Sequence, residues 1–449
     1  MELSTEQITA LAPDPASAKA GRGLMNPGKW PALGRSEEAE ALWGECQGSG
    51  KDPYQVSVDL AGLASKCSCP SRKFPCKHGL ALMYMAVEKP ASLAAGMPPA
   101  WTADWLANRR EKAEKKAAAP PAAEKKPVDA EAAAKRSAKR LDRMQEGGAE
   151  LARWVADQVR SGIATLPQQA ASTFKTVAAR MVDAQVPGLS VEMARLEGQL
   201  HNGPEWPRRT LAQLGRMHYI TEGLSRYETL PPPLQSDLRA TLGWTMDKEE
   251  LVASQPPVVD NWCIVGQGFT EHERLWERRT WLIGRQTRNS ALVLDFSHGS
   301  RNFPIPLIPG SEVEAAVIFF PSATPLRAIL LESPTRPAPS TEPFPTFEDI
   351  AAAFARITEA LAANPWLHQA PLALENVTPY RTAAGAWAIR DRAGAQLPLN
   401  LADLDAWSLL AISGGQPLRV FGEWTAGALQ VYGAWTDRFH PFTWTTYDE

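Results

Sequence analysis

One stretch of the sequence limits the fold more than any other: residues 67–78 read CSCPSRKFPCKH and hold three of the five cysteines in the chain. Cys67 and Cys69 are two residues apart, and Cys76 and His78 repeat that spacing. In an extended segment, side chains two residues apart point to the same side, so each pair can face one ion. The six residues between the pairs are enough for the chain to turn back. This spacing predicts that the four side chains meet at one metal ion.

The residue types of this cluster indicate zinc. Three thiolates and one imidazole complete a tetrahedron, at about 2.0–2.3 Å from the ion. Four protein ligands leave no open position for the water molecule that a catalytic zinc requires, so the sequence predicts a structural ion. Several cations lie close enough to offset the charge of three thiolates: Lys66, Arg72, Lys73 and Lys77. The alternative interpretation is that the cysteines are small buried residues and His78 is an ordinary core or surface histidine.

The residues on either side of the cluster predict a small ββα unit. Residues 54–60, YQVSVDL, alternate between apolar and polar side chains and predict a strand. Residues 79–87, GLALMYMAV, form an apolar run of helical length that ends before Pro90. The last ligand therefore lies at the start of a helix. We expect Cys46 to pack near this unit rather than to bind metal, and Cys263 to be a buried strand residue.

The pattern C-x-C-x6-C-x-H followed by an apolar helix resembles the SWIM zinc finger. The resemblance is to the bacterial proteins of this type in particular, in which a segment like residues 43–60, WGECQGSGKDPYQVSVDL, leads into the finger. It implies a ββα fold, a role in DNA or protein contacts, and association with MoxR-type AAA ATPases and von Willebrand A domain proteins. It also implies the zinc ligands Cys67, Cys69, Cys76 and His78. The resemblance covers about residues 40–90 and implies nothing about the rest of the chain.

Composition divides the chain into four parts, which together predict an α+β multidomain fold. The first is an N-terminal unit over residues 1–106, with the zinc finger at about residues 54–90. Residues 107–146 form a basic linker rich in Ala, Lys and Pro. Within it, residues 108–143 hold twelve Lys or Arg and six acidic residues, whereas the whole chain has a net charge of −3. Such a composition predicts a flexible or partly helical tether.

Hydrophobic periodicity distinguishes the last two parts. Leu151, Val155 and Val159 recur at helical spacing and, with similar runs further on, predict a helical segment over residues 147–250. Residues 251–449 hold short segments rich in β-branched and aromatic residues, which predict a β-rich α+β domain. One helix is expected within it, with Thr346 as its N-cap.

The cysteine count and the N-terminal sequence indicate the compartment. Five cysteines, an odd number in a long chain, do not match a disulfide framework of the secreted kind. The N-terminal sequence MELSTEQITALAPDP contains acidic side chains and lacks the basic start and apolar run of a signal peptide. No stretch approaches the ~18 apolar residues of a membrane span. We therefore expect a soluble, cytoplasmic protein with no membrane association.

The sequence offers no convincing catalytic set. Asp295, Ser297 and His298 are residue types of a hydrolase, but they lie side by side at a predicted strand end, and no G-x-S-x-G turn surrounds the serine. Residues 48–51, GSGK, lack the earlier glycine and the following Ser or Thr of a phosphate-binding loop. We therefore expect a protein that is not an enzyme.

Two functions of different class stay open. The first is an interaction module or scaffold for protein partners, which the β-rich part favours because it has neither a catalytic set nor a basic bias. The alternative is binding of nucleic acid (DNA) through the basic finger and linker, with Arg72, Lys73 and Lys77 as phosphate contacts. Trp101 and Trp105 would share a helix face, and would either pack it onto the finger or offer a stacking surface beside the linker.

Overall fold

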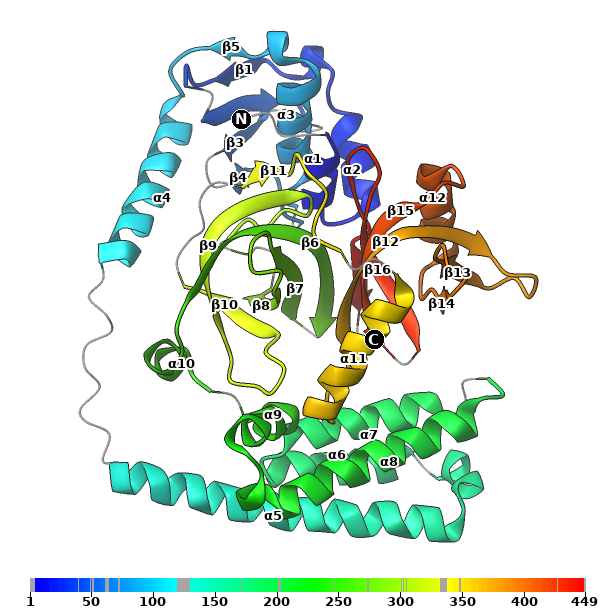
Figure 1. Ribbon diagram of the computed structural model, residues 1–449. Helices are drawn as coiled ribbons and strands as arrows, with labels where there is room; N and C mark the ends of the chain where they lie inside the picture. Colours follow the sequence, from blue (N-terminus) through cyan, green and yellow to red (C-terminus); the bar gives the residue numbers. More distant parts are fainter. Residues whose placement is uncertain are drawn as a thin grey trace.

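The computed structural model confirms the α+β multidomain fold predicted from the sequence. Figure 1 shows an N-terminal unit at the top, two further β-sheets in the middle and a layer of helices at the bottom. Among the described residues, no helix has both the length and the apolar character needed to cross a membrane. The structure describes residues 5–447, apart from residues 39, 49, 51, 61–63, 72, 119–129, 170, 201–202, 245, 273, 300, 302, 304, 332–336, 347–348 and 426.

The N-terminal unit is a five-stranded sheet packed against helix α3 (Lys77–Glu88). Val56 and Val58 of β3 are fully buried and lie in one cluster with residues 80–85 of α3. Helices α1 and α2 contact α3 as well, so that α3 has neighbours beyond the sheet. The strand order is β4-β3-β2-β1-β5, and the elements are α1 (Thr5–Leu11), α2 (Pro15–Arg22), β1 (Ala32–Arg35), β2 (Ala41–Cys46), β3 (Tyr54–Asp59), β4 (Ala64–Cys67) and β5 (Ala94–Ala95).

Helices run across all three boundaries that composition predicted. Helix α4 (Ala100–Ala118) continues past residue 106, α5 (Ala130–Ser161) starts before residue 147, and α10 (Lys248–Ser254) spans residue 250. Ala, Lys, Glu and Arg favour helix formation, so the basic sequence extends the flanking helices. Met144 of α5 is already buried in the helical core. Residues 119–129 of the predicted linker lie outside the described residues.

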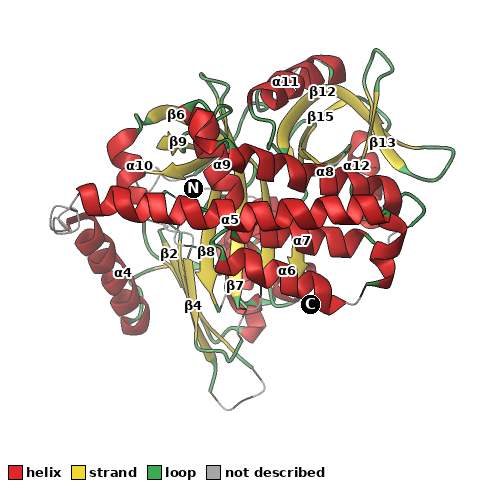
Figure 2. Cartoon of the chain, turned by 90° about the horizontal axis from the view of Figure 1, so that it is seen from below, coloured by secondary structure: helices red, strands yellow, loops and turns green. Residues whose placement is uncertain are grey.

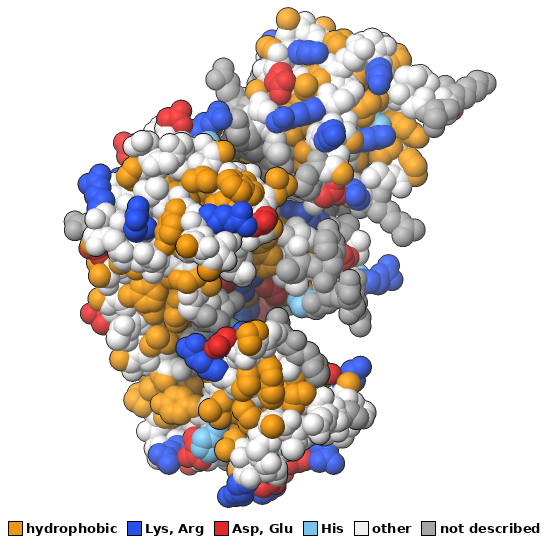
Figure 3. Space-filling model, turned by 90° about the vertical axis from the view of Figure 1, so that its right-hand side faces the viewer, with side chains coloured by type: hydrophobic (Ala, Val, Ile, Leu, Met, Phe, Trp, Pro, Cys, Tyr) orange, Lys and Arg blue, Asp and Glu red, His pale blue; other side chains and the backbone are white. Residues whose placement is uncertain are grey.

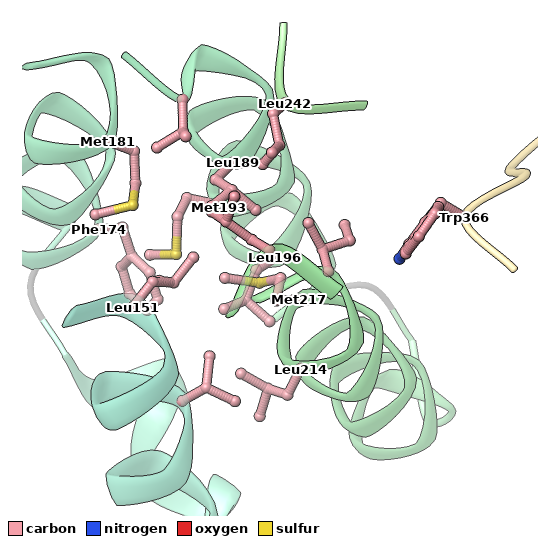
Figure 4. Close-up of a cluster of buried hydrophobic side chains, with 14 of the residues drawn as sticks. Leu151, Phe174, Met181, Leu189, Met193, Leu196, Leu214, Met217, Leu242 and Trp366 are labelled. Atoms are coloured by element: carbon pink, nitrogen blue, oxygen red, sulfur yellow. The ribbon is translucent and has the colours of Figure 1, made fainter. Parts of the chain in front are cut away.

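Helices α5 to α9 form the helical layer, and Figure 2 shows α5 running along it. Their buried side chains recur at three- and four-residue spacing, as in α7, which buries Leu189, Met193 and Leu196. These side chains point into one core, drawn in Figure 4. The remaining bounds are α6 (Ala171–Asp183), α7 (Pro187–Gln199), α8 (Trp206–Ser225) and α9 (Pro232–Leu242).

The close approach of α7 to α9 gives a testable prediction. A Cβ built on Gly188 would lie 1.9 Å from the carbonyl oxygen of Thr241, so an alanine there forces the two helices apart. We expect Gly188→Ala to lower the free energy of unfolding by about 1–3 kcal/mol or more, as at other overpacked sites. Gly198→Ala is the matched control, because it lies in the same helix and its Cβ would meet nothing within 4 Å. It should raise stability by up to about 1 kcal/mol. Amide hydrogen exchange in α7 and α9 tests both variants, and equal exchange rates in the two variants would contradict the prediction.

The first sheet of the β-rich part closes on itself, and we call it the closed sheet. Strand β6 pairs with β7 on one side and with β9 on the other, and β10 joins β9 to β8. Trp262 and Ile264 of β6 lie in one buried cluster, whereas the alternate residues Cys263 and Val265 pack in another, against the second sheet. The strands are β6 (Val258–His272), β7 (Leu275–Gly284), β8 (Ser290–His298), β9 (Ser311–Phe319), β10 (Arg327–Leu330), β11 (Ala338–Pro339) and β18 (Trp444–Tyr447).

The second sheet carries helices α11 (Ile350–Ala363) and α12 (Asp403–Ser413). The predicted N-cap Thr346 is wrong: Asp349, an equally good cap, lies directly before α11 and accepts a hydrogen bond from the N–H of Ala352. Thr346 instead donates to Glu375, over an O–O distance of 2.9 Å. The strand order is β14-β13-β12-β15-β16-β17, with β12 (Ala370–Arg381), β13 (Trp387–Arg390), β14 (Gln396–Pro398), β15 (Leu418–Thr425), β16 (Ala428–Trp435) and β17 (Phe439–Pro441).

The segment between α11 and β12, residues 364–369, anchors the second sheet to the helical layer. Trp366 is 5% exposed and packs in the helical core. Its ring lies so close to α8 that a Cβ on Gly223 would approach it to 2.5 Å. Arg216 donates a hydrogen bond to the carbonyl oxygen of Trp366 at 3.1 Å. Figure 4 shows Trp366 entering from outside the helices, so one inserted side chain joins two parts of the fold.

His368 makes this anchoring contact sensitive to pH. Burial, followed by the charges of Arg195 and Arg216, lowers the pKa of His368 to about 4. Because an unfolded histidine titrates near pH ~6.5, the undocked state takes up a proton first as the pH falls. The contact is therefore fully stable above about pH 6.5 and weakens toward pH 4. We expect amide hydrogen exchange in α8, corrected for intrinsic rates, to accelerate over this range, and His368→Gln to remove most of that change. Constant corrected exchange in the unaltered protein would contradict the prediction.

Candidate metal centre

Strand β4 and helix α3 bring the four predicted ligands together. Cys67 is the last residue of β4, and Cys69 follows in the turn. Cys76 is the N-cap of α3, and His78 lies in the first turn of that helix. The succession of β3, β4, turn and α3 is the ββα arrangement that the sequence predicted. Three further strands extend its sheet, which the sequence did not predict.

The spacing of the ligand atoms fits a tetrahedral zinc ion. One atom from each of the four side chains lies within 4.8 Å of all the others. The Nδ1 atom of His78 is 3.7 Å from Sγ of Cys67 and 3.9 Å from Sγ of Cys76. Ordinary zinc bond lengths separate a sulfur from a nitrogen ligand by about 3.5 Å. The four residues are therefore positioned to bind a zinc ion and to fill all of its coordination positions.

Two family models match the chain, and one of them covers this site. The model of the SWIM zinc finger matches residues 54–86, and that of the SWIM-associated four-helix bundle domain matches residues 139–242. The chain contains a SWIM zinc finger. The bundle match spans most of α5 and all of α6 to α9. No curated protein and no solved structure matches the chain.

The SWIM-associated bundle was not recognised from the sequence, although helices were predicted there. Apolar residues at helical spacing indicate that helices form, but they do not specify how many pack around one core. The combination of a SWIM finger with its associated bundle confirms the resemblance found at residues 40–90. That the protein is of the bacterial type stays a prediction.

The SWIM finger holds its ligands in a largely buried setting. Cys76 and His78 are 2% and 5% exposed, and the ring centroid of Tyr54 lies 5.1 Å from that of His78. Hydrogen bonds from Cys67, from His78 and from backbone N–H groups in the first turn of α3 lower the pKa of Cys76. The pKa of Cys67 is raised, because it keeps the proton that it shares with Cys76. The protein itself thus favours the deprotonated form of Cys76. A bound cation would favour deprotonation of Cys67 and Cys69 as well.

The other two cysteines are buried in hydrophobic cores and do not belong to the ligand set of the SWIM finger. Cys46 ends β2, has no exposed surface and lies in the core of the N-terminal unit, as predicted for a packing residue. Cys263 of β6 is buried between the closed sheet and the second sheet. Burial raises the pKa of both thiols.

The three cations predicted to contact nucleic acid lie in different surroundings. Arg72 lies outside the described residues. The Nζ atom of Lys73 is 2.7 Å from a carboxylate oxygen of Asp14, and Asp14 also caps α2. Lys77 is exposed at the start of α3. Lys73 therefore ties the SWIM finger to α2, and Lys77 is the clearest of the three as a contact for an outside ligand.

Helix α4 lies against the sheet of the SWIM finger. Thr102 is fully buried, and its hydroxyl lies 2.9 Å from that of Ser57 in β3. Trp101 and Trp105, on either side of this contact, are half-buried. The guanidinium of Arg109 lies over the ring of Trp105, 5.4 Å from its centroid. The helix thus packs onto the sheet through Thr102, while Trp105 keeps part of its ring exposed beside an arginine.

Proposed function

We propose that this SWIM zinc-finger protein is a non-enzymatic interaction module that docks protein partners, with zinc holding its N-terminal unit in shape. The burial of α3 carries this proposal, because residues 78–85 are all buried. A helix that reads DNA must present side chains to the groove. Helix α3 instead contacts β2, β3, β4, α1 and α2. Helix α3 of the finger therefore belongs to the core of the N-terminal unit and does not present a face that could read a DNA groove.

Helix α12 offers an exposed apolar surface for a partner. Leu404 and Trp407 lie one turn apart on it and are 78% and 49% exposed. Trp407 packs edge-on against Trp387, with ring centroids 4.9 Å apart, and Arg381 lies over the Trp407 ring at 5.9 Å. Tryptophan and arginine dominate binding at many protein interfaces. Figure 3, viewed from the side on which the second sheet lies, shows several patches of hydrophobic side chains on this face.

The resemblance to bacterial SWIM proteins supplies a class of partner, a MoxR-type AAA ATPase. The test is a titration of the full chain with the purified ATPase of the same organism, with and without ATP. We expect binding that the double variant Leu404→Ser/Trp407→Ser weakens at least about tenfold, or ~1.4 kcal/mol. Met97→Ser is the matched control, because Met97 is an apolar residue of the N-terminal unit and is 92% exposed.

Two results would count against this proposal. Failure to bind in every nucleotide state would rule out the ATPase as the partner. Equal weakening by Met97→Ser and by the α12 variant would rule out α12 as the docking surface.

Binding of nucleic acid through the finger and linker is the second candidate function. Exposed Lys77 and the basic sequence of residues 108–143 support it. Binding of this kind weakens with salt, with a log–log slope of about −0.7 to −0.9 for each phosphate contacted. A salt titration with duplex and single-stranded DNA tests it, and Lys77→Gln should make the slope shallower. Absence of binding at low salt would leave protein docking as the better proposal.

A further inference from the structure

A cleft of about 310 Å³ lies between the N-terminal unit and the closed sheet. One wall comes from the end of α1, β4, the turn after it and α4, and the other comes from β6, β7 and the residues Arg301, Phe303, Pro306 and Leu307. Arg301 also contacts the N-terminal unit outside the cleft, where it donates a hydrogen bond to the carbonyl oxygen of Pro13 at 2.7 Å. The volume is at the lower end of the ~300–1,000 Å³ that is usual for small-molecule sites.

The cleft is lined by cations. They are Lys66, Arg109, Arg278 and Arg301. None of the described residues in its lining is acidic. Arg278 is held by Asp295, which accepts hydrogen bonds from Nε at 3.1 Å and from Nη2 at 2.6 Å. Arg109 pairs with Asp59 at 3.2 Å. A guanidinium has five N–H donors, so these ion pairs orient the arginines and leave donors for a ligand.

Each of the three arginines lies over an aromatic ring. The distances from guanidinium carbon to ring centroid are 4.5 Å for Arg278 and Phe303, 3.2 Å for Arg301 and Phe269, and 5.4 Å for Arg109 and Trp105. Such contacts fix the plane of a guanidinium. Groups that are ordered before a ligand arrives lose less conformational entropy when it binds. The cleft therefore combines fixed, planar cations with aromatic side chains.

We propose that this cleft binds a nucleotide, either free or as part of a single strand. The fork of a guanidinium matches a phosphate group, and charge-assisted hydrogen bonds of this kind are strong. The half-buried rings of Trp105 and Phe303 give a base a surface for stacking. This site goes beyond protein docking, since no residue of α12 lines it; of the zinc ligands, Cys67 alone is among the lining residues.

Fluorescence anisotropy with a labelled oligothymidylate of ~12 nucleotides, within the site sizes of single-strand binders, tests the proposal on the full zinc-loaded chain. We expect Arg109→Gln/Arg301→Gln to weaken binding at least tenfold. Loss of two phosphate contacts should also reduce the slope of log K against log salt by about 1.4. Arg160→Gln is the matched control, because Arg160 lies on the helical layer and its side chain is 77% exposed. It should leave both quantities unchanged.

Competition with unlabelled ligands shows which class of molecule the cleft binds. Displacement by ATP identifies a free nucleotide as the ligand, and displacement only by unlabelled single strand identifies a strand; either result supports the proposal. Preference for polyglutamate would identify an acidic protein segment and overturn it, as would unchanged affinity in the double variant.

If the double variant loses its zinc or its helix content, Lys66→Gln replaces it, because Lys66 is exposed. It should reduce the slope by about 0.7, and no change in slope would overturn the proposal. Lys77→Gln and the α12 variant should bind normally, which separates this site from both proposed functions.

Discussion

Cys76→Ser is expected to abolish zinc binding and to unfold the N-terminal unit. Cys76 is the N-cap of α3 and is 2% exposed within the ligand set, so serine there removes one of the three thiolate ligands from a buried position. Structural zinc contributes on the order of 10–16 kcal/mol of apparent binding free energy in small zinc-dependent folds. Metal analysis of the purified variant, with hydrogen exchange in β3, β4 and α3, measures both effects.

Cys46→Ser is the matched control for this prediction. Cys46 is also a fully buried cysteine of the N-terminal unit, but it lies in the hydrophobic core and not among the ligands. We expect this variant to keep its zinc and to lose only about 1–3 kcal/mol, the usual penalty for burying a hydroxyl without a partner. A Cys76→Ser protein with full zinc content and unchanged exchange would contradict the assignment of this ligand.

Trp366→Ala is expected to have the second largest effect, at the junction between the second sheet and the helical layer. Removing a buried tryptophan side chain lowers stability by about 3–5 kcal/mol. Trp366 belongs to the core of the helical layer but lies in the segment after α11. Its loss should therefore weaken both the packing of the helical core and the contact between the second sheet and the helical layer. Unfolding of a protein with several domains need not be two-state, so hydrogen exchange is the appropriate measurement. Exchange should accelerate in α8, where Gly223 meets the ring.

Trp407→Ala provides the comparison for this effect. Trp407 is a tryptophan of the same β-rich part, but it is 49% exposed on α12. Its replacement should lower the free energy of unfolding by about 0.5–1.5 kcal/mol, the range for an edge-on aromatic contact beyond its burial. Equal acceleration of exchange in α8 by both variants would contradict the claim that Trp366 joins the second sheet to the helical layer.

The metal site could be predicted from the sequence because its determinants are local. Four ligands fall within residues 67–78, and their paired spacing needs only a strand end and a helix start to converge. The choice of zinc followed from ligand chemistry, since three thiolates and an imidazole suit a tetrahedral ion. The burial of Cys46 followed from the habits of free cysteine. None of these steps required knowledge of distant contacts.

Other features depend on contacts that leave no local signal. The closed sheet exists because β6 pairs with β9, some fifty positions further on, as in the match of Trp262 with Val313. Trp366 reads as a loop residue in the sequence, yet it packs against α8 from a segment far along the chain. Helix α5 begins within the predicted linker, and the sequence does not specify this start because alanine and lysine occur in both tethers and helices. Composition alone does not separate these two structures.

Metal analysis of the reduced, purified protein tests the central claim most directly, together with the absorption spectrum after cobalt substitution. The cluster of Cys67, Cys69, Cys76 and His78 predicts one zinc ion per chain and, with cobalt, the intense visible bands of tetrahedral coordination by three sulfurs and one nitrogen. Protein that is free of metal when purified without chelators, or a weak octahedral cobalt spectrum, would contradict it.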